Sequence, residues 1–134
     1  DLSWEKYEVI RNGVVYKNIF DAFSQFQFYD YTKILGRKVG LNDNYDLTFS
    51  AADGNDADVQ KAIVQGYNIA TVFGVKKTEP LPKTYFSRRV INGDDSDLRF
   101  LDRRGVVVGL YAKGKAKKDT SGFVKYPTVM LKAA

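Results

Sequence analysis

Residues 45–73 have the sequence YDLTFSAADGNDADVQKAIVQGYNIATVF, and this stretch decides the fold. Its two ends, 45–50 and 68–73, are short runs of alternating or compact apolar residues that favour β-strands. Between them, Asp and Asn residues precede a helical spacing of apolar side chains, which predicts a helix over 56–65, and Gly66 is suited to end it. Strand, helix and strand in this order predict a right-handed βαβ unit with parallel strands.

The segments on either side of this unit extend the pattern. Apolar side chains near the amino terminus have an approximate helical spacing, whereas several other segments are rich in β-forming residues. We expect helices over 3–11 and 15–23, strands over 26–32 and 106–111, short extended segments at 85–86 and 90–91, and a final extended segment over 124–131. The chain is therefore predicted to be a single α/β domain, 1–134, built from βα units with a largely parallel sheet in a half-barrel or three-layer arrangement.

The composition restricts the chemistry that this chain can perform. Its 134 residues include no cysteine and no histidine. Within the chain, this excludes disulfides, thiolate nucleophiles, Ser-His-Asp triads and metal sites built on Cys or His. Catalysis would have to use carboxylates, lysine, tyrosine or hydroxyl groups. The formal net charge of +5 favours an anionic partner, either nucleic acid or another phosphate-bearing ligand, and the alternative is a solvated basic surface without a partner.

The ends of the chain and its hydropathy bear on location. No apolar run approaches the roughly 20 residues that a membrane-spanning helix needs, and Asp1–Glu5 lacks the apolar core of a signal peptide. We therefore expect a cytoplasmic protein without membrane contact. Because the sequence starts without methionine, we also expect it to be a fragment of a longer protein.

Polar residues at the predicted strand ends are the first candidates for a site, because ligands of parallel α/β sheets bind at the carboxyl ends of the strands. Asp30 and Lys33 follow the strand over 26–32 and could form an acid–base pair, and Ser50 ends the next strand. We take these three as the catalytic candidates. Thr32 is a candidate ligand-binding residue at the same strand end.

A basic run supplies the remaining ligand-binding candidates. Residues 113–118, KGKAKK, place four lysines within six residues around a glycine, and Lys113 and Lys115 are expected to contact phosphate. Arg99 is a further candidate for ligand binding. The run is not a phosphate-binding P-loop, because the Gly-x-x-x-x-Gly-Lys-Ser/Thr pattern is missing.

An acidic turn raises the question of a metal. Asp94, Asp95 and Asp97 place three carboxylates in four residues, which is dense enough to hold Mg²⁺ or Ca²⁺. The turn lacks the later bidentate Glu of a calcium loop, so a solvated turn is the favoured interpretation. The prediction is therefore no cofactor, with Mg²⁺ as the alternative.

Four segments carry a resemblance to a known family. They are FYDYTK at 28–33, NYDLTFS at 44–50, NGDDSDLRFLD at 92–102 and GLYAKG at 109–114. Together they resemble the carboxyl-terminal half of a family of uncharacterised phage and prophage proteins. The longer members carry a cysteine-bearing amino-terminal half, and they look like iron–sulfur or radical-type barrel proteins. Cluster chemistry does not transfer to this chain, because it has no cysteine.

Two classes of function stay open from the sequence. The chain is either the phage-derived remnant of an enzyme acting on nucleotides or nucleic acid, or a non-catalytic binding module that uses its basic surface. A half-barrel would leave sheet edges exposed, so a homo-oligomer that covers these edges is also expected.

Overall fold

The computed structural model describes residues 1–37 and 44–127. Two sheets account for the strands of this part of the chain. The smaller sheet contains β1 (Val9–Arg11) and β2 (Val14–Tyr16), and the larger one contains β3 (Phe28–Thr32), β4 (Tyr45–Ser50), β5 (Asn68–Phe73), β6 (Thr84–Tyr85), β7 (Arg88–Asn92), β8 (Val107–Tyr111) and β9 (Val124–Lys125). The helices are α1 (Ile19–Ala22) and α2 (Asp56–Val64), with 3-10 turns η1 (Trp4–Lys6), η2 (Gly93–Asp95), η3 (Arg99–Leu101) and η4 (Gly114–Lys118).

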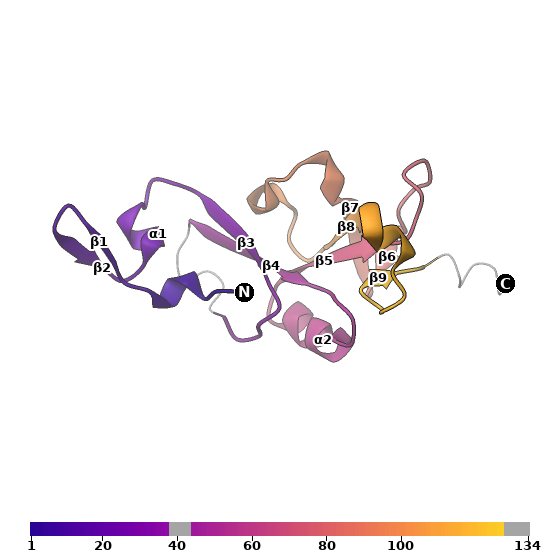
Figure 1. Ribbon diagram of the computed structural model, residues 1–134, viewed down its shortest axis with the longest axis horizontal. Helices are drawn as coiled ribbons and strands as arrows, with labels where there is room; N and C mark the ends of the chain where they lie inside the picture. Colours follow the sequence, from indigo (N-terminus) through magenta and orange to yellow (C-terminus); the bar gives the residue numbers. More distant parts are fainter. Residues whose placement is uncertain (38–43, 128–134) are drawn as a thin grey trace.

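The larger sheet has the strand order β3-β4-β5-β8-β7-β6, and Figure 1 shows it running through the middle of an elongated molecule. Every pairing within β3, β4, β5, β8 and β7 is parallel, and only β6 joins antiparallel to β7. Along its first half β5 pairs with β4, and at its end it pairs with β9 on a second parallel ladder. The predicted α/β fold with a largely parallel sheet is confirmed.

The βαβ unit is confirmed almost residue by residue. The strands over 45–50 and 68–73 are present as predicted, and the helix ends one residue early, at Val64. Val59 and Ala62 of α2 are fully buried against Phe49 and Ile69 of the sheet. These apolar side chains share one face of the strands, because alternate residues of a strand point to opposite faces. The main core therefore lies between α2 and the sheet.

The other face of the sheet is more polar. Thr48 of β4 and Asn68 of β5 are buried there, with 1% of each residue exposed. The segment that contains η2 and η3 lies over this face, and the ring of Phe100 packs against Tyr29 of β3 with centroids 5.8 Å apart. The loop between β7 and β8 thus substitutes for a helix as the second cover of the sheet.

The helix predicted over 3–11 is wrong. Only a 3-10 turn forms there, and the chain then enters the antiparallel hairpin of β1 and β2, which projects at one end of the molecule in Figure 1. Asn12 and Gly13 connect the strands with φ values of 51° and 77°. Positive φ at both central residues defines the hairpin turn that Asn-Gly favours, so local turn chemistry overrides the apparent helical spacing.

The helix predicted over 15–23 is also mostly wrong. Its first part is β2, and α1 covers only Ile19–Ala22. Asn18 fixes the start of this helix, because its side-chain oxygen accepts a hydrogen bond of 3.0 Å from the N–H of Asp21.

The remaining predicted elements need smaller corrections. The strand over 26–32 begins two residues later, the one over 106–111 begins one residue later, and the short segments at 85–86 and 90–91 correspond to β6 and β7. The final segment over 124–131 is a strand only at Val124–Lys125, and its last four residues lie outside the described part of the chain. No helix in the described residues is sufficiently long and apolar to cross a membrane.

The sheet is open, and β3 forms one of its edges. The N–H of Phe28 donates to the Asn44 carbonyl on the side of β4, so the N–H of Tyr31 points away from the sheet. The Asp30 carboxylate accepts a hydrogen bond of 2.8 Å from this N–H. The Asp30 side chain therefore takes up one of the backbone N–H groups that the β3 edge would otherwise offer to another strand. Self-association through a free edge stays a prediction, which light scattering at micromolar concentration would test.

Candidate anion-binding site

A lysine-lined cavity lies where β5 and β8 end side by side. Phe73 of β5 is paired with Tyr111 of β8, so the chain leaves both strands at the same edge of the sheet. The cavity has a volume of about 360 Å³ and is lined by Gly74, Val75, Lys76, Lys77, Ala112, Lys113, Gly114 and Lys117. This is the carboxyl edge of parallel strands, where open α/β sheets bind ligands. We call it the lysine cavity.

Four ammonium groups surround the lysine cavity, and among the described residues only one of them has an acidic partner. The Nζ atom of Lys113 lies 2.9 Å from Oδ1 of Asp94. Within the described part of the chain, the side chains of Lys76, Lys77 and Lys117 form no ion pair. The cavity therefore carries an excess of positive charge that an anion would offset.

Asp94 connects the side chain of Lys113, which lines the cavity, to the end of β8. Besides pairing with Lys113, it accepts a hydrogen bond of 3.0 Å from the N–H of Tyr111 through Oδ2. Burial by itself raises the pKa of Asp94, but these two hydrogen bonds, together with the charges of Lys113 and Lys77, outweigh it and hold the pKa below its usual value. The Tyr111 hydroxyl donates to the Glu79 carbonyl at 2.7 Å, which ties the loop that carries Lys76 to β8.

The lining determines what the cavity can do chemically. It offers ammonium groups and backbone, and none of the lining side chains is a carboxylate or a hydroxyl. Lysine ammonium groups bind phosphate as point charges with rotatable donors. The arrangement is suited to holding a phosphate group, because it provides positive charge. It offers no obvious base or nucleophile at neutral pH, so it is less suited to catalysis.

Of the ligand-binding residues predicted from the sequence, Lys113 lines the cavity. Lys115 lies on η4, exposed to solvent and outside the cavity lining. Asp94 contacts the cavity through Lys113, and the structure does not gather Asp94, Asp95 and Asp97 into a group that could hold a metal ion.

Arg99, another predicted ligand-binding residue, is buried and binds backbone carbonyls of its own loop. Only 1% of the residue is exposed, and its Nη2 donates to the carbonyls of Gly93, at 2.9 Å, and of Ser96. Its Nε lies 3.3 Å from Oδ2 of Asp102, an ion pair without hydrogen-bond geometry. Arg99 therefore connects η2 to η3 beneath the surface, where a ligand could not reach it.

The catalytic candidates do not join the lysine cavity. Asp30 lies on β3, three strands away from β8, which alone separates it from Lys113 by about 14 Å. Its second carboxylate oxygen lies 3.5 Å from the Tyr45 hydroxyl. The Lys33 ammonium group lies 6.0 Å from the ring centre of Phe123. Ser50 ends β4, where its carbonyl accepts a hydrogen bond from the Asn55 side chain.

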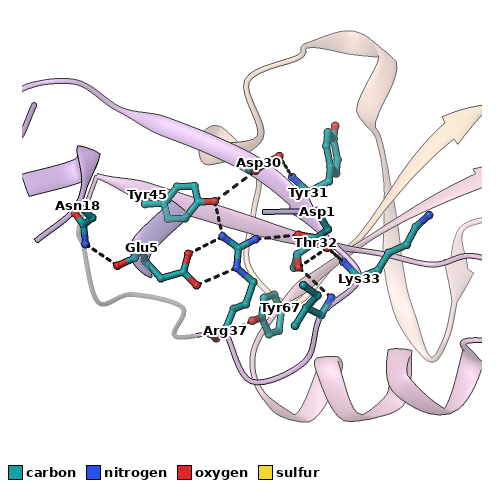
Figure 2. Close-up of polar contacts among 11 residues, drawn as sticks. Asp1, Glu5, Asn18, Asp30, Tyr31, Thr32, Lys33, Arg37, Tyr45 and Tyr67 are labelled. Atoms are coloured by element: carbon teal, nitrogen blue, oxygen red, sulfur yellow. Dashed lines mark hydrogen bonds and ion pairs between the residues drawn. The ribbon is translucent and has the colours of Figure 1, made fainter. Parts of the chain in front are cut away.

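Thr32 belongs to a buried polar cluster around Arg37, which Figure 2 shows in close-up. The Asp1 carboxylate accepts hydrogen bonds from the Thr32 hydroxyl at 3.0 Å and the Lys33 N–H at 2.6 Å. Glu5 binds the Arg37 guanidinium with both oxygens, at 3.1 and 2.7 Å, and Arg37 also donates to the Tyr45 hydroxyl at 2.8 Å. This cluster fastens the amino-terminal segment to the end of β3.

Two parts of this arrangement are not among the residues predicted from the sequence. Lys76 and Lys77 follow the end of β5 after Gly74 and Val75, and the rule that pointed to the ends of the other strands would have found them. The pairing of Asp1 and Glu5 with Arg37 has no local signal, because the partners are more than thirty residues apart in the sequence.

Comparisons with known proteins place the chain in a family. No curated protein and no solved structure matches it. The family model described as Gene product 88 matches residues 1–127, which is nearly the whole chain. This confirms the resemblance to phage proteins at the level of the family. The chain belongs to the phage-derived Gene product 88 family.

Proposed function

We propose that this chain binds nucleic acid non-catalytically, through phosphate groups held in the lysine cavity. The observation that supports the proposal is a cavity at the carboxyl edge of the parallel strands, lined by four lysines of which only Lys113 is paired with an acidic group among the described residues. Exposed Lys115 and Lys118 lie on the adjoining η4 and would add to the attraction of a polyanion. The proposed setting is the cytoplasm.

Binding is favoured over catalysis because the acid–base candidates lie elsewhere. Catalytic roles for Asp30, Lys33 and Ser50 stay predictions, and so does descent from an enzyme acting on nucleotides. The relation to longer relatives of the iron–sulfur barrel type is likewise a prediction. The binding proposal needs none of these residues.

Paired lysine substitutions test the proposal. The K76Q/K77Q variant should bind a fluorescently labelled 20-nucleotide DNA at least about 10-fold more weakly than the unmodified chain near 100 mM salt, measured by fluorescence anisotropy. The slope of log K against log salt should fall by about 0.7–0.9 for each phosphate contact that is lost.

A matched control removes the same charge at a distance from the cavity. Lys17 and Lys61 are both exposed, and neither lines the lysine cavity. The K17Q/K61Q variant should lose affinity less than about threefold, since only the long-range field changes. Equal losses in the two double variants would show that the charge acts without a site, and the proposal would then be abandoned.

Asp94→Asn is expected to act in the opposite direction. Asparagine can still accept the hydrogen bond from the Tyr111 N–H, but it releases Lys113 from its ion pair and removes a negative charge beside the cavity. Affinity for the same DNA should rise about fivefold, which corresponds to the ~1 kcal/mol that two unit charges exchange at 4 Å in water. Anisotropy titration at low salt measures the effect, and weaker binding by this variant would contradict it.

A further inference from the structure

A second hollow adjoins the lysine cavity. It has a volume of about 510 Å³ and is lined by Lys117, Lys118, Asp119, Thr120, Gly122, Val124 and Tyr126. Lys117 of η4 lines both hollows, so the two hollows share one ammonium group. A ligand longer than one phosphate group could contact both hollows without leaving positively charged surface.

Tyr126 marks a second point where the hollows meet. A Cβ atom placed on Gly74 would lie 2.1 Å from Cε1 of the Tyr126 ring, so the ring rests directly on the glycine backbone. Gly74 lines the lysine cavity, whereas Tyr126 lines the second hollow. The absence of a side chain at Gly74 is thus what allows the ring to lie between them.

The Tyr126 ring is both fixed and accessible. Its hydroxyl donates to the Asp119 carbonyl at 2.7 Å, and Gly74 supports the ring from below. Even so, 40% of the residue is exposed to solvent. A held aromatic ring with an open surface is the kind of platform on which single-strand binders stack bases.

Asp119, the acidic residue of the second hollow, is hydrogen-bonded within its own loop. The Asp119 carboxylate accepts hydrogen bonds from the Ser121 hydroxyl at 2.8 Å and from the Val124 N–H at 3.1 Å. Lys117 and Lys118 form no ion pair within the described residues. The second hollow therefore keeps two ammonium groups and the Thr120 hydroxyl available for a phosphate.

From these contacts we infer that the ligand is a single-stranded nucleic acid that crosses both hollows. Its phosphates contact Lys76, Lys77 and Lys117, and one base stacks on Tyr126. A duplex fits less well, because its bases are stacked inside and present no free face to a ring. We expect a site of about four nucleotides, the lower end of the range for small single-strand sites. The inference rests on the proposed function and specifies the ligand of the same site.

Substitutions of Tyr126 test the stacking contact with a labelled eight-nucleotide oligo-dT. Tyr126→Leu should weaken binding about 5- to 150-fold, the range that the loss of one base–aromatic stack produces. Tyr126→Phe keeps the ring and should stay within about threefold of the unmodified chain. Tyr7→Leu is the control, since Tyr7 is an exposed tyrosine on the amino-terminal segment, and it should change nothing.

Ligand length and inorganic tripolyphosphate separate the two proposals. Affinity should rise from two to four nucleotides and then level off, a duplex of eight pairs should bind more weakly, and Tyr126→Leu should keep its affinity for tripolyphosphate. If Tyr126→Leu binds oligo-dT as tightly as the unmodified chain while tripolyphosphate still competes, the stacking inference falls and the proposed function stands. If neither tripolyphosphate nor DNA binds the unmodified chain, both fall.

Discussion

Arg37→Met should lower the free energy of unfolding by about 3–5 kcal/mol, the usual cost of removing one partner from a buried ion pair. The side chain of Arg37 is 1% exposed, and it is the only cation that pairs with Glu5 among the described residues. Methionine fills much of the same volume but leaves the Glu5 carboxylate, which is 10% exposed, without a positive partner. Urea unfolding followed by circular dichroism measures the loss.

Lys6→Met is the matched control for this substitution. Lys6 is an exposed neighbour of Glu5 that forms no ion pair in the described part of the chain, so its replacement should change stability by no more than about 0.5 kcal/mol. A loss below about 1 kcal/mol in Arg37→Met would show that the cluster contributes little to holding the amino-terminal segment.

The pH dependence provides an independent check on the Arg37 cluster. Hydrogen bonds from Arg37 lower the pKa of Glu5 in the folded chain, although burial opposes them. The unfolded chain therefore takes up a proton on Glu5 first as the pH falls, and stability is lost between about pH 5 and pH 3. Arg37→Met should show a smaller loss over this window, because its Glu5 has no arginine to keep it ionised.

Arg99→Met should also lower the free energy of unfolding by about 3–5 kcal/mol. The substitution removes the donors to the carbonyls of Gly93 and Ser96 and leaves Asp102, whose side chain is 10% exposed, without its ion pair. Gly93 begins η2, the turn that carries Asp94. We therefore also expect Asp94 to hold Lys113 of the lysine cavity less firmly. Arg103→Met is the control: Arg103 is exposed, and its side chain forms no ion pair with any residue that the structure describes. The substitution keeps the backbone carbonyl that accepts a hydrogen bond from the Asn68 side chain.

Asp102 distinguishes this effect from a simple loss of packing. Burial raises the pKa of Asp102, and the charge of Arg99 opposes that rise. The pKa of Asp102 is already above its usual value with Arg99 in place, and without Arg99 it should rise further. The folded variant should therefore bind a proton more readily than the unmodified folded chain, so the deficit of Arg99→Met should shrink as the pH is lowered from about 7 to 5. A deficit that is constant across this range would argue for lost packing alone.

The central part of the fold could be predicted because its signals are local and agree with one another. In β4, Leu47 and Phe49 alternate with polar residues, α2 has its apolar residues on one side, and the strand–helix–strand order leaves few topologies open. The amino-terminal hairpin was missed because Trp4, Tyr7 and Ile10 imitate helical spacing, whereas the decisive information is in the Asn12-Gly13 turn.

The candidate site was predictable only in part. The basic run pointed to Lys113, and the rule for strand ends would have added Lys76 and Lys77 if applied to β5. The separation of Asp30 from the cavity could not be predicted, because it depends on strand order, and the order places β8 beyond β5. Arg99 shows the same limit, since charge alone does not reveal that a guanidinium will be buried beneath a loop.

The pairing of β9 with the end of β5 has a consequence for how the protein is made. β4 pairs with the first half of β5 but does not reach Val72 and Phe73. At these two residues, the strand partner on that edge of β5 is Val124 and Lys125 of β9. A nascent chain must therefore emerge from the ribosome through Lys125 before the middle of its sheet is complete. Until then, a bare stretch of the central strand is available to other chains, a hazard that a chaperone or rapid synthesis would reduce.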